Sequence, residues 1–216
     1  PNYVIQVERT RPAARVMLGR LRIEPLERQA LVEQHVIPLL APGGTQRSEL
    51  PHVLAFVLAQ QAHCSALGNG LLENRLLAMR ARVLATDGGV VEVGSPDADA
   101  GMLQRLHLGP QLRLCCLGPG AIDFVPRPPP EGFREVDEAA YLAIDGDAQK
   151  WIRLFAGLGI DWFPVATPAR APALDDWQSP ALDAVLRTLT EAEDSLRLIQ
   201  LLAVLSNLWM RRDGRS

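Results

Sequence analysis

Lysine is almost absent from this chain of 216 residues. Lys150 is the only lysine among 22 basic residues, and arginine accounts for the other 21. We interpret this bias mainly as the codon usage of GC-rich DNA, which favours a bacterial source, and less as selection for the bidentate donors of arginine. Cysteine is also rare, because there are only three, two of them adjacent, and no C-x-x-C motif. This shortage excludes a disulfide framework.

Long apolar runs and the common catalytic motifs are missing as well. No stretch reaches the roughly 18 consecutive apolar residues of a membrane span, and the first residues lack the features of a signal peptide. The sequence contains no P-loop, G-x-S-x-G, H-E-x-x-H or dinucleotide-binding fingerprint. We therefore expect a cytoplasmic protein, and we predict no cofactor and no bound metal.

The composition is that of a globular protein, with 48% hydrophobic and 22% charged residues. The net charge of -3 argues against a general nucleic-acid binder, but the charge is unevenly distributed. Residues 1–82 hold ten arginines and six acids, which gives +4, whereas the remainder holds twelve basic residues and nineteen acids, which gives -7. The first part of the chain is therefore the one suited to anions.

The first half of the chain predicts two strands followed by helices. β-branched runs indicate strands at 3–7 and 15–23. Helical spacing of apolar residues then begins at Pro25, resumes after Ser48 as a good N-cap, and resumes again after two glycines at 68–70. We expect a helical hairpin or a long broken helix over about 25–84.

The second half predicts short strands on both sides of a proline-rich connector. The strand-like runs are "VVEV", "LRLCCL", "IDFV" and "AYLAI", at 90–93, 112–117, 122–125 and 140–144. A short helix follows at 147–159, with Asp145 or Asp147 at its start. The proline-rich segment "PRPPPEG" at 126–132 predicts a stiff extended connector, because consecutive prolines fix φ and exclude a helix.

A long helix is the clearest prediction. Ser179 is its expected N-cap, Pro180 its first residue, and Arg211 and Arg212 suit its C-terminal end. So many leucines follow at helical spacing that the helix must bury two sides, either across the domain or against another subunit. The residues that we predict at a partner interface are Leu186, Leu189, Ile199, Leu202, Leu205 and Trp209.

These elements predict an α+β fold. A small, mainly antiparallel sheet packs with the helical hairpin at about 25–84 and the long C-terminal helix at about 179–212. We expect an α+β domain at 1–163 that includes the helical insertion, a proline-rich linker at 164–178, and a C-terminal helix at 179–216 that packs on the domain or on another subunit.

The N-terminal arginines are the best candidates for binding an anion or a nucleotide. Arg11 and Arg15 in "RPAAR" form an R-x-x-x-R pair just before a predicted strand, with Arg9 nearby. Guanidinium groups bind phosphates and stack on guanine. This motif is similar to the arginine motif of PilZ domains, and the resemblance implies a receptor for cyclic di-GMP.

The first eleven residues allow a second alternative. An N-terminal proline can act as a general base when its pKa is lowered. "PNYVIQVERTR" resembles the start of the tautomerase superfamily. The resemblance implies that Pro1 is the base and that Arg11 binds a substrate carboxylate.

Other chemical groups favour structural roles. His52 and His63 lie eleven residues apart, about 16 Å along a helix, so one metal ion cannot bind both. Cys115 and Cys116 are expected on opposite faces of a strand. The interpretation that we favour is a non-catalytic regulatory, adaptor or assembly protein that acts through protein binding and self-association, with the nucleotide receptor and the tautomerase as alternatives.

Overall fold

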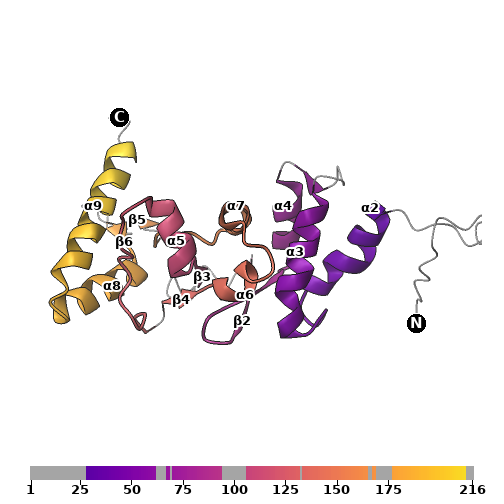
Figure 1. Cartoon of the computed structure of the whole chain (residues 1–216), viewed down its shortest axis with the longest axis horizontal. Helices are drawn as coiled ribbons and strands as arrows, with labels where there is room; N and C mark the ends of the chain where they lie inside the picture. Colours follow the sequence, from indigo (N-terminus) through magenta and orange to yellow (C-terminus); the bar gives the residue numbers. More distant parts are fainter. Residues whose placement is uncertain are drawn as a thin grey trace, which may run out of the picture.

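The protein has an α+β fold, as predicted, in which short strands lie between helices (Figure 1). From α2 (Arg28–Leu31) to α9 (Ser195–Arg212), the elements follow one another roughly in chain order along the longest axis (Figure 1). The predicted strands at 3–7 and 15–23 lie outside the described residues. The computed structural model describes residues 28–61, 67–68, 70–93, 106–131, 133–164, 167–168 and 177–212.

The N-terminal unit is helical, as the spacing of its apolar residues predicts. Pro38 cannot donate a backbone hydrogen bond, and the first helix changes to π and then to 3-10 geometry around it. Gly70 immediately precedes α4 (Leu71–Ala78), the last helix of this unit. Its φ is +79°, a conformation that glycine adopts without strain. The segments are α2, η1 (Val32–Val36), η2 (Ile37–Leu40), η3 (Arg47–Glu49), α3 (Leu50–Gln60) and α4 (Leu71–Ala78).

Two details of this unit differ from the prediction. Ser48 lies inside the 3-10 turn η3, and α3 begins after Glu49 without a side-chain cap. Helix α4 ends at Ala78, before the end of the predicted helical segment at residue 84. The next element is a strand of three residues, β1 (Arg82–Leu84). Backbone hydrogen bonds of β1 to a neighbouring strand therefore outweigh the helical spacing of residues 79–84.

The strands form three separate pairs within the described residues. β1 pairs with β2 (Val90–Glu92) in antiparallel orientation, which confirms the strand predicted at 90–93. The parallel pair joins β3 (Leu106–His107) to β4 (Arg134–Glu135), and β3 also forms a bridge from His107 to Asp161. The third pair, β5 (Thr167–Pro168) with β6 (Trp177–Gln178), is antiparallel and lies within the predicted linker.

Three predicted strands are wrong. Residues 112–117 belong to helix α5 (Pro110–Leu117), and residues 140–142 belong to helix α6 (Glu138–Leu142). Residues 122–125 form no regular element. Both helices depend on acidic caps, because Asp137 accepts from the Ala140 N–H in α6, and a distant carboxylate caps α5, as described below. The predicted helix at 147–159 is confirmed as α7 (Ala148–Gly157), capped by Asp147.

The central core joins the N-terminal helices to α6, α7 and the first two strand pairs. Tyr141, Trp151 and Phe155 are fully buried there, with ring centroids 5.0–5.8 Å apart. The hydroxyl of Tyr141 accepts the backbone N–H of Leu84, which ties α6 to β1. Burial raises the pKa of this tyrosine above its ordinary value.

A smaller C-terminal core packs the last two helices against the loop after α5. Its buried residues include Phe124, Val125 and Phe133 from the loop and β4 region, together with Ala181, Val185, Leu189 and Leu201 from the two helices. The long helix predicted at 179–212 is instead two helices, α8 (Pro180–Glu191) and α9. Among the described helices none is both long enough and apolar enough to cross a membrane.

Candidate functional site

The C-terminal hairpin of α8 and α9 is defined by capping residues. Ser179 accepts the N–H of Leu182 and Pro180 is the first residue of α8, as predicted. The chain reverses at Glu193, whose φ is +52°. Asp194 then accepts the N–H of Arg197 at the start of α9. Burial of Leu189 and Leu201 on the inner side of this reversal stabilises it.

One side of α9 faces inward. Leu201 is fully buried and Val204 is buried as well, while Leu205 is half-buried against the same C-terminal core. These residues recur at intervals of three and one, which places them on one face of a helix. The inner face of α9 therefore contributes to the fold.

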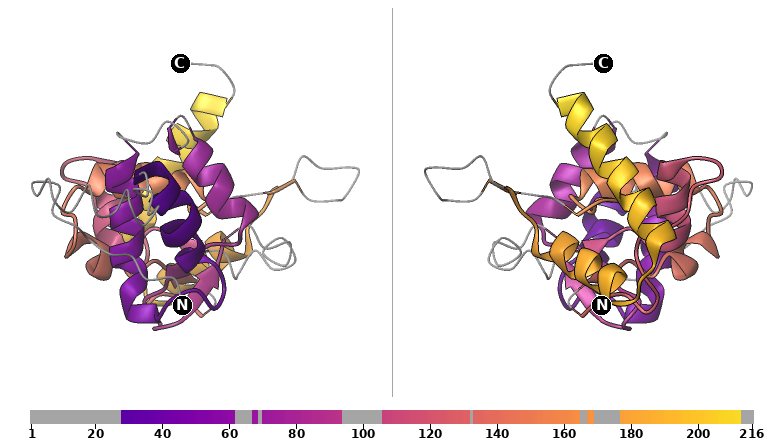
Figure 2. Two further views of the ribbon diagram at one scale, coloured as in Figure 1. Left: turned by 90° about the vertical axis from the view of Figure 1, so that its right-hand side faces the viewer. Right: turned by 90° about the vertical axis from the view of Figure 1, so that its left-hand side faces the viewer.

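The opposite side of α9 presents large apolar side chains to solvent. Leu196, Ile199 and Leu202 are 61%, 64% and 53% exposed, and their spacing of three keeps them on one side of the helix. Figure 2 shows α9 as the outermost element at its end of the molecule, crossing the front of the right-hand view. No charged residue occurs from Leu198 to Met210. We name the outer surface formed by residues 196, 199, 202, 203 and 206 the outer face of α9.

The structure divides the predicted interface residues between these two sides. Ile199 and Leu202 are exposed on the outer face. Leu189 is fully buried in the C-terminal core, and Leu186 and Leu205 pack at its edge. The side chain of Trp209 lies outside the described part. Leu196 is a further exposed residue that the predicted set omitted, although its position three residues before Ile199 indicates the same face.

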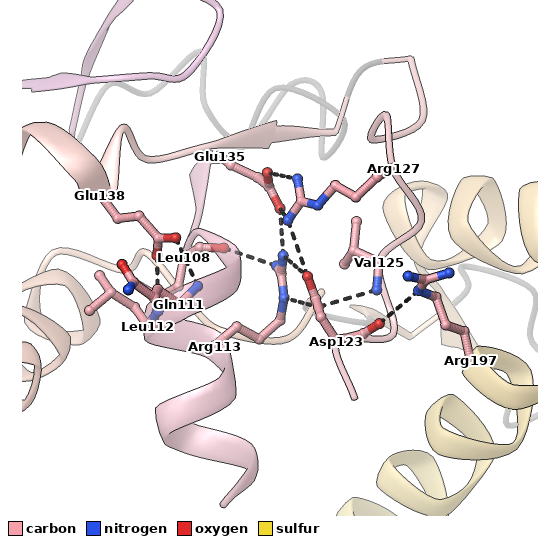
Figure 3. Close-up of polar contacts among 10 residues, drawn as sticks. All are labelled: Leu108, Gln111, Leu112, Arg113, Asp123, Val125, Arg127, Glu135, Glu138 and Arg197. Carbon is pink, nitrogen blue, oxygen red and sulfur yellow. Dashed lines mark hydrogen bonds and ion pairs between the residues drawn. The ribbon is translucent and has the colours of Figure 1, made fainter. Parts of the chain in front are cut away.

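A buried ionic cluster lies beneath the hairpin (Figure 3). The Arg113 side chain is fully buried and donates from Nε and Nη2 to the two carboxylate oxygens of Asp123, at 2.6 and 3.2 Å. It also donates to the Leu108 carbonyl at 2.9 Å and to the Glu135 carboxylate. The guanidinium lies between the rings of Phe124 and Phe133, 5.5 and 5.8 Å from their centroids.

Arg127 completes this cluster from the solvent side. It contacts both Asp123 and Glu135, and 39% of its side chain is exposed. Burial acts to lower its pKa, but the hydrogen bond and charge of Glu135, together with those of Asp123, outweigh burial and raise it. Two guanidinium groups thus oppose two carboxylates.

The cluster connects to α9 through Arg197. Its Nε donates to the Asp123 backbone carbonyl at 3.1 Å (Figure 3). Its guanidinium also contacts Asp194. The pKa of Asp194 is lowered, first by the backbone N–H of Arg197 and then by its side chain. The loop that carries Asp123 therefore holds the first turn of α9.

A second buried carboxylate caps α5. Glu138 accepts the backbone N–H groups of Gln111 and Leu112, at 2.8 and 2.9 Å, and so satisfies donors that a helix start leaves free. Burial raises the pKa of Glu138, and the two backbone bonds oppose this shift. A Cβ atom at Gly109 would overlap the Glu138 carboxyl group, so only glycine permits this close approach.

The remaining candidates have structural roles or lie outside the described residues. Cys115 is exposed and Cys116 is half-buried on α5, where burial raises the pKa of the Cys116 thiol. Asp145 binds Lys150. The described residues contain no group of three or more metal-ligating side chains that could hold an ion. The candidate residues Pro1, Arg9, Arg11, Arg15 and His63 lie outside the described part of the chain.

Comparisons with protein families, with curated proteins and with solved structures find no match to this chain.

Proposed function

We propose that this is a non-catalytic cytoplasmic protein with a regulatory, adaptor or assembly role, which binds protein chains and its own copies through the outer face of α9. The observation that carries the proposal is the exposure of Leu196, Ile199 and Leu202 on one side of a helix whose other side is buried. Adjacent exposed apolar residues of this size are typical of a protein interface.

The apolar surface is large enough for reversible self-association. Complete burial of one leucine or isoleucine contributes about 2 kcal/mol, and Leu196, Ile199 and Leu202 are each more than half exposed. Covering all three on each of two chains therefore contributes about 7 kcal/mol. Loss of translational and rotational freedom opposes association by an amount of the same order. We expect association that depends on concentration.

Sedimentation velocity tests this proposal. We expect the weight-average mass of the wild type to rise between about 1 and about 100 μM, the range in which weak complexes form. Ile199→Glu places a charge on the outer face and should keep the protein monomeric. Leu71→Glu is the matched control, because Leu71 is 50% exposed on α4, remote from α9 (Figure 1). A monomeric wild type, or equal effects of the two variants, would refute the proposal.

The nucleotide-receptor and tautomerase interpretations stay predictions. The first depends on Arg9, Arg11 and Arg15, and the second depends on Pro1 and Arg11. All of these residues lie outside the described part of the chain. Calorimetry with cyclic di-GMP on the wild type and Arg11→Ala tests the first, and an enol-to-keto assay before and after acetylation of Pro1 tests the second.

A further inference from the structure

The hairpin of α8 and α9 belongs to a different apolar core from the rest of the chain. The central core extends from Val32 to Ile160, and no described residue of α8 or α9 belongs to it. The hairpin contributes instead to the C-terminal core, where Leu189 and Leu201 pack with the loop after α5. Figure 1 places the hairpin at the end of the longest axis that is opposite α2. Packing of the larger core therefore does not require these two helices.

Few polar contacts fix the hairpin to the rest of the fold. In the part of the chain that the structure describes, one hydrogen bond leads from α8 or α9 to another segment, from Arg197 Nε to the Asp123 backbone carbonyl at 3.1 Å (Figure 3). Other side-chain contacts of the two helices stay within the hairpin, as between Arg197 and Asp194 and between Thr188 and the Ala184 carbonyl. Apolar packing and Arg197 therefore hold the hairpin in place.

The loop beneath the hairpin is fixed from its other side. Nε and Nη2 of Arg113 bind the carboxylate of Asp123, the residue that precedes Phe124. The same guanidinium lies over the rings of Phe124 and Phe133. Arg113 is anchored in turn, because its neighbour Leu112 lies in the central core. None of these contacts involves α8 or α9, so the loop can keep its position when the hairpin leaves it.

We propose that the hairpin of α8 and α9 opens as one unit while the central core stays folded, and that Arg197 holds it closed. Proteins open in cooperative units of unequal stability, and a unit with few contacts to the main core opens most readily. Opening exposes Phe124, Val125 and Phe133 together with the inner side of the hairpin. The open state thus presents a second apolar surface that the closed state conceals, and its formation does not depend on binding through the outer face of α9.

Hydrogen exchange followed by mass spectrometry tests this proposal on the full chain. The measurement uses pH 7 and about 1 μM protein, the low end of the range for weak association. Relative to unfolded-chain rates, we expect α8 and α9 to exchange equally, and at least about tenfold faster than α3 and α7. Low concentrations of urea should accelerate exchange less steeply in the hairpin than in α7, because its opening exposes less surface.

A variant of Arg197 tests what holds the hairpin closed. Arg197→Met should accelerate exchange in both α8 and α9 about fivefold, as expected for the loss of one hydrogen bond, and should leave α7 unchanged. The rate in α8 is decisive, since the contact of Arg197 with Asp194 lies at the start of α9. Arg187→Met is the matched control, because Arg187 is exposed on α8, and it should change no rate.

Two results would overturn the proposal. Equal protection of the hairpin and of α7, with the same dependence on urea, would show that the chain unfolds as a single unit. Acceleration of α9 alone in Arg197→Met would show that Arg197 stabilises its own helix and does not hold the hairpin closed. Neither result bears on self-association through the outer face, which sedimentation of the wild type measures separately.

Discussion

The buried guanidinium of Arg113 gives the sharpest test of what stabilises this fold. Arg113 and Arg127 contact the same two carboxylates, Asp123 and Glu135, but the Arg113 side chain is fully buried, whereas 39% of the Arg127 side chain is exposed. If burial determines how much each arginine stabilises the fold, replacing each one singly by methionine should lower the free energy of unfolding by unequal amounts.

We expect Arg113→Met to lower the free energy of unfolding by about 3 kcal/mol, the low end for breaking a buried ion pair, because Arg127 still contacts both acids. Arg127→Met should cost about 1 kcal/mol, since solvent screens its charge. Urea unfolding at pH 7 measures both changes. Arg153→Met is the control, because Arg153 is exposed on α7 and should change stability by less than about 0.5 kcal/mol. Equal losses of the free energy of unfolding for Arg113→Met and Arg127→Met would refute the reasoning that burial determines the contribution of each arginine.

Two further predictions concern the caps of α5 and α9. Gly109→Ala should destabilise the protein by about 1–3 kcal/mol, measured by urea unfolding, because its Cβ would displace the Glu138 carboxyl that caps α5; unchanged stability would contradict this. In an NMR titration, Asp194 should have a folded-state pKa below 3.8, so its stabilising effect is present above pH 3.8 and is lost as the pH falls through the lowered value. Arg197→Met should move that pKa toward 3.8.

Local signals in the sequence predict the features that depend on neighbouring residues. Ser179 followed by Pro180 marks the start of α8, and Asp147 marks the start of α7, because each cap acts on backbone groups within three residues. The apolar spacing in α9 likewise predicts two buried sides. One of those sides packs within the chain, and the other is exposed.

Features that depend on residues far apart in the chain are not predicted from the sequence. The run at 112–117 looks like a strand, but Glu138 caps it as a helix from 26 residues away. The hairpin between α8 and α9 contains neither glycine nor proline, so the reversal at Glu193 has no local signal. The pairing of Arg113 with Asp123 and Glu135 cannot be predicted from the sequence, because the three residues lie in separate segments that meet only in the folded chain.

The parallel pairing at β3 sets an order for folding during synthesis. His107 pairs with Glu135 and bridges to Asp161. The two-residue strand β3 can therefore form these pairs only after residues 28 and 54 positions later have been synthesised. The central core, which extends to Ile160, cannot close on the ribosome before that point in the chain has emerged. Phe124, Val125 and Phe133 also pack against α8 and α9, so the part of their surface that these helices cover stays exposed until the helices are translated. A chain that stops before residue 180 would present these side chains to chaperones and to other unfinished chains.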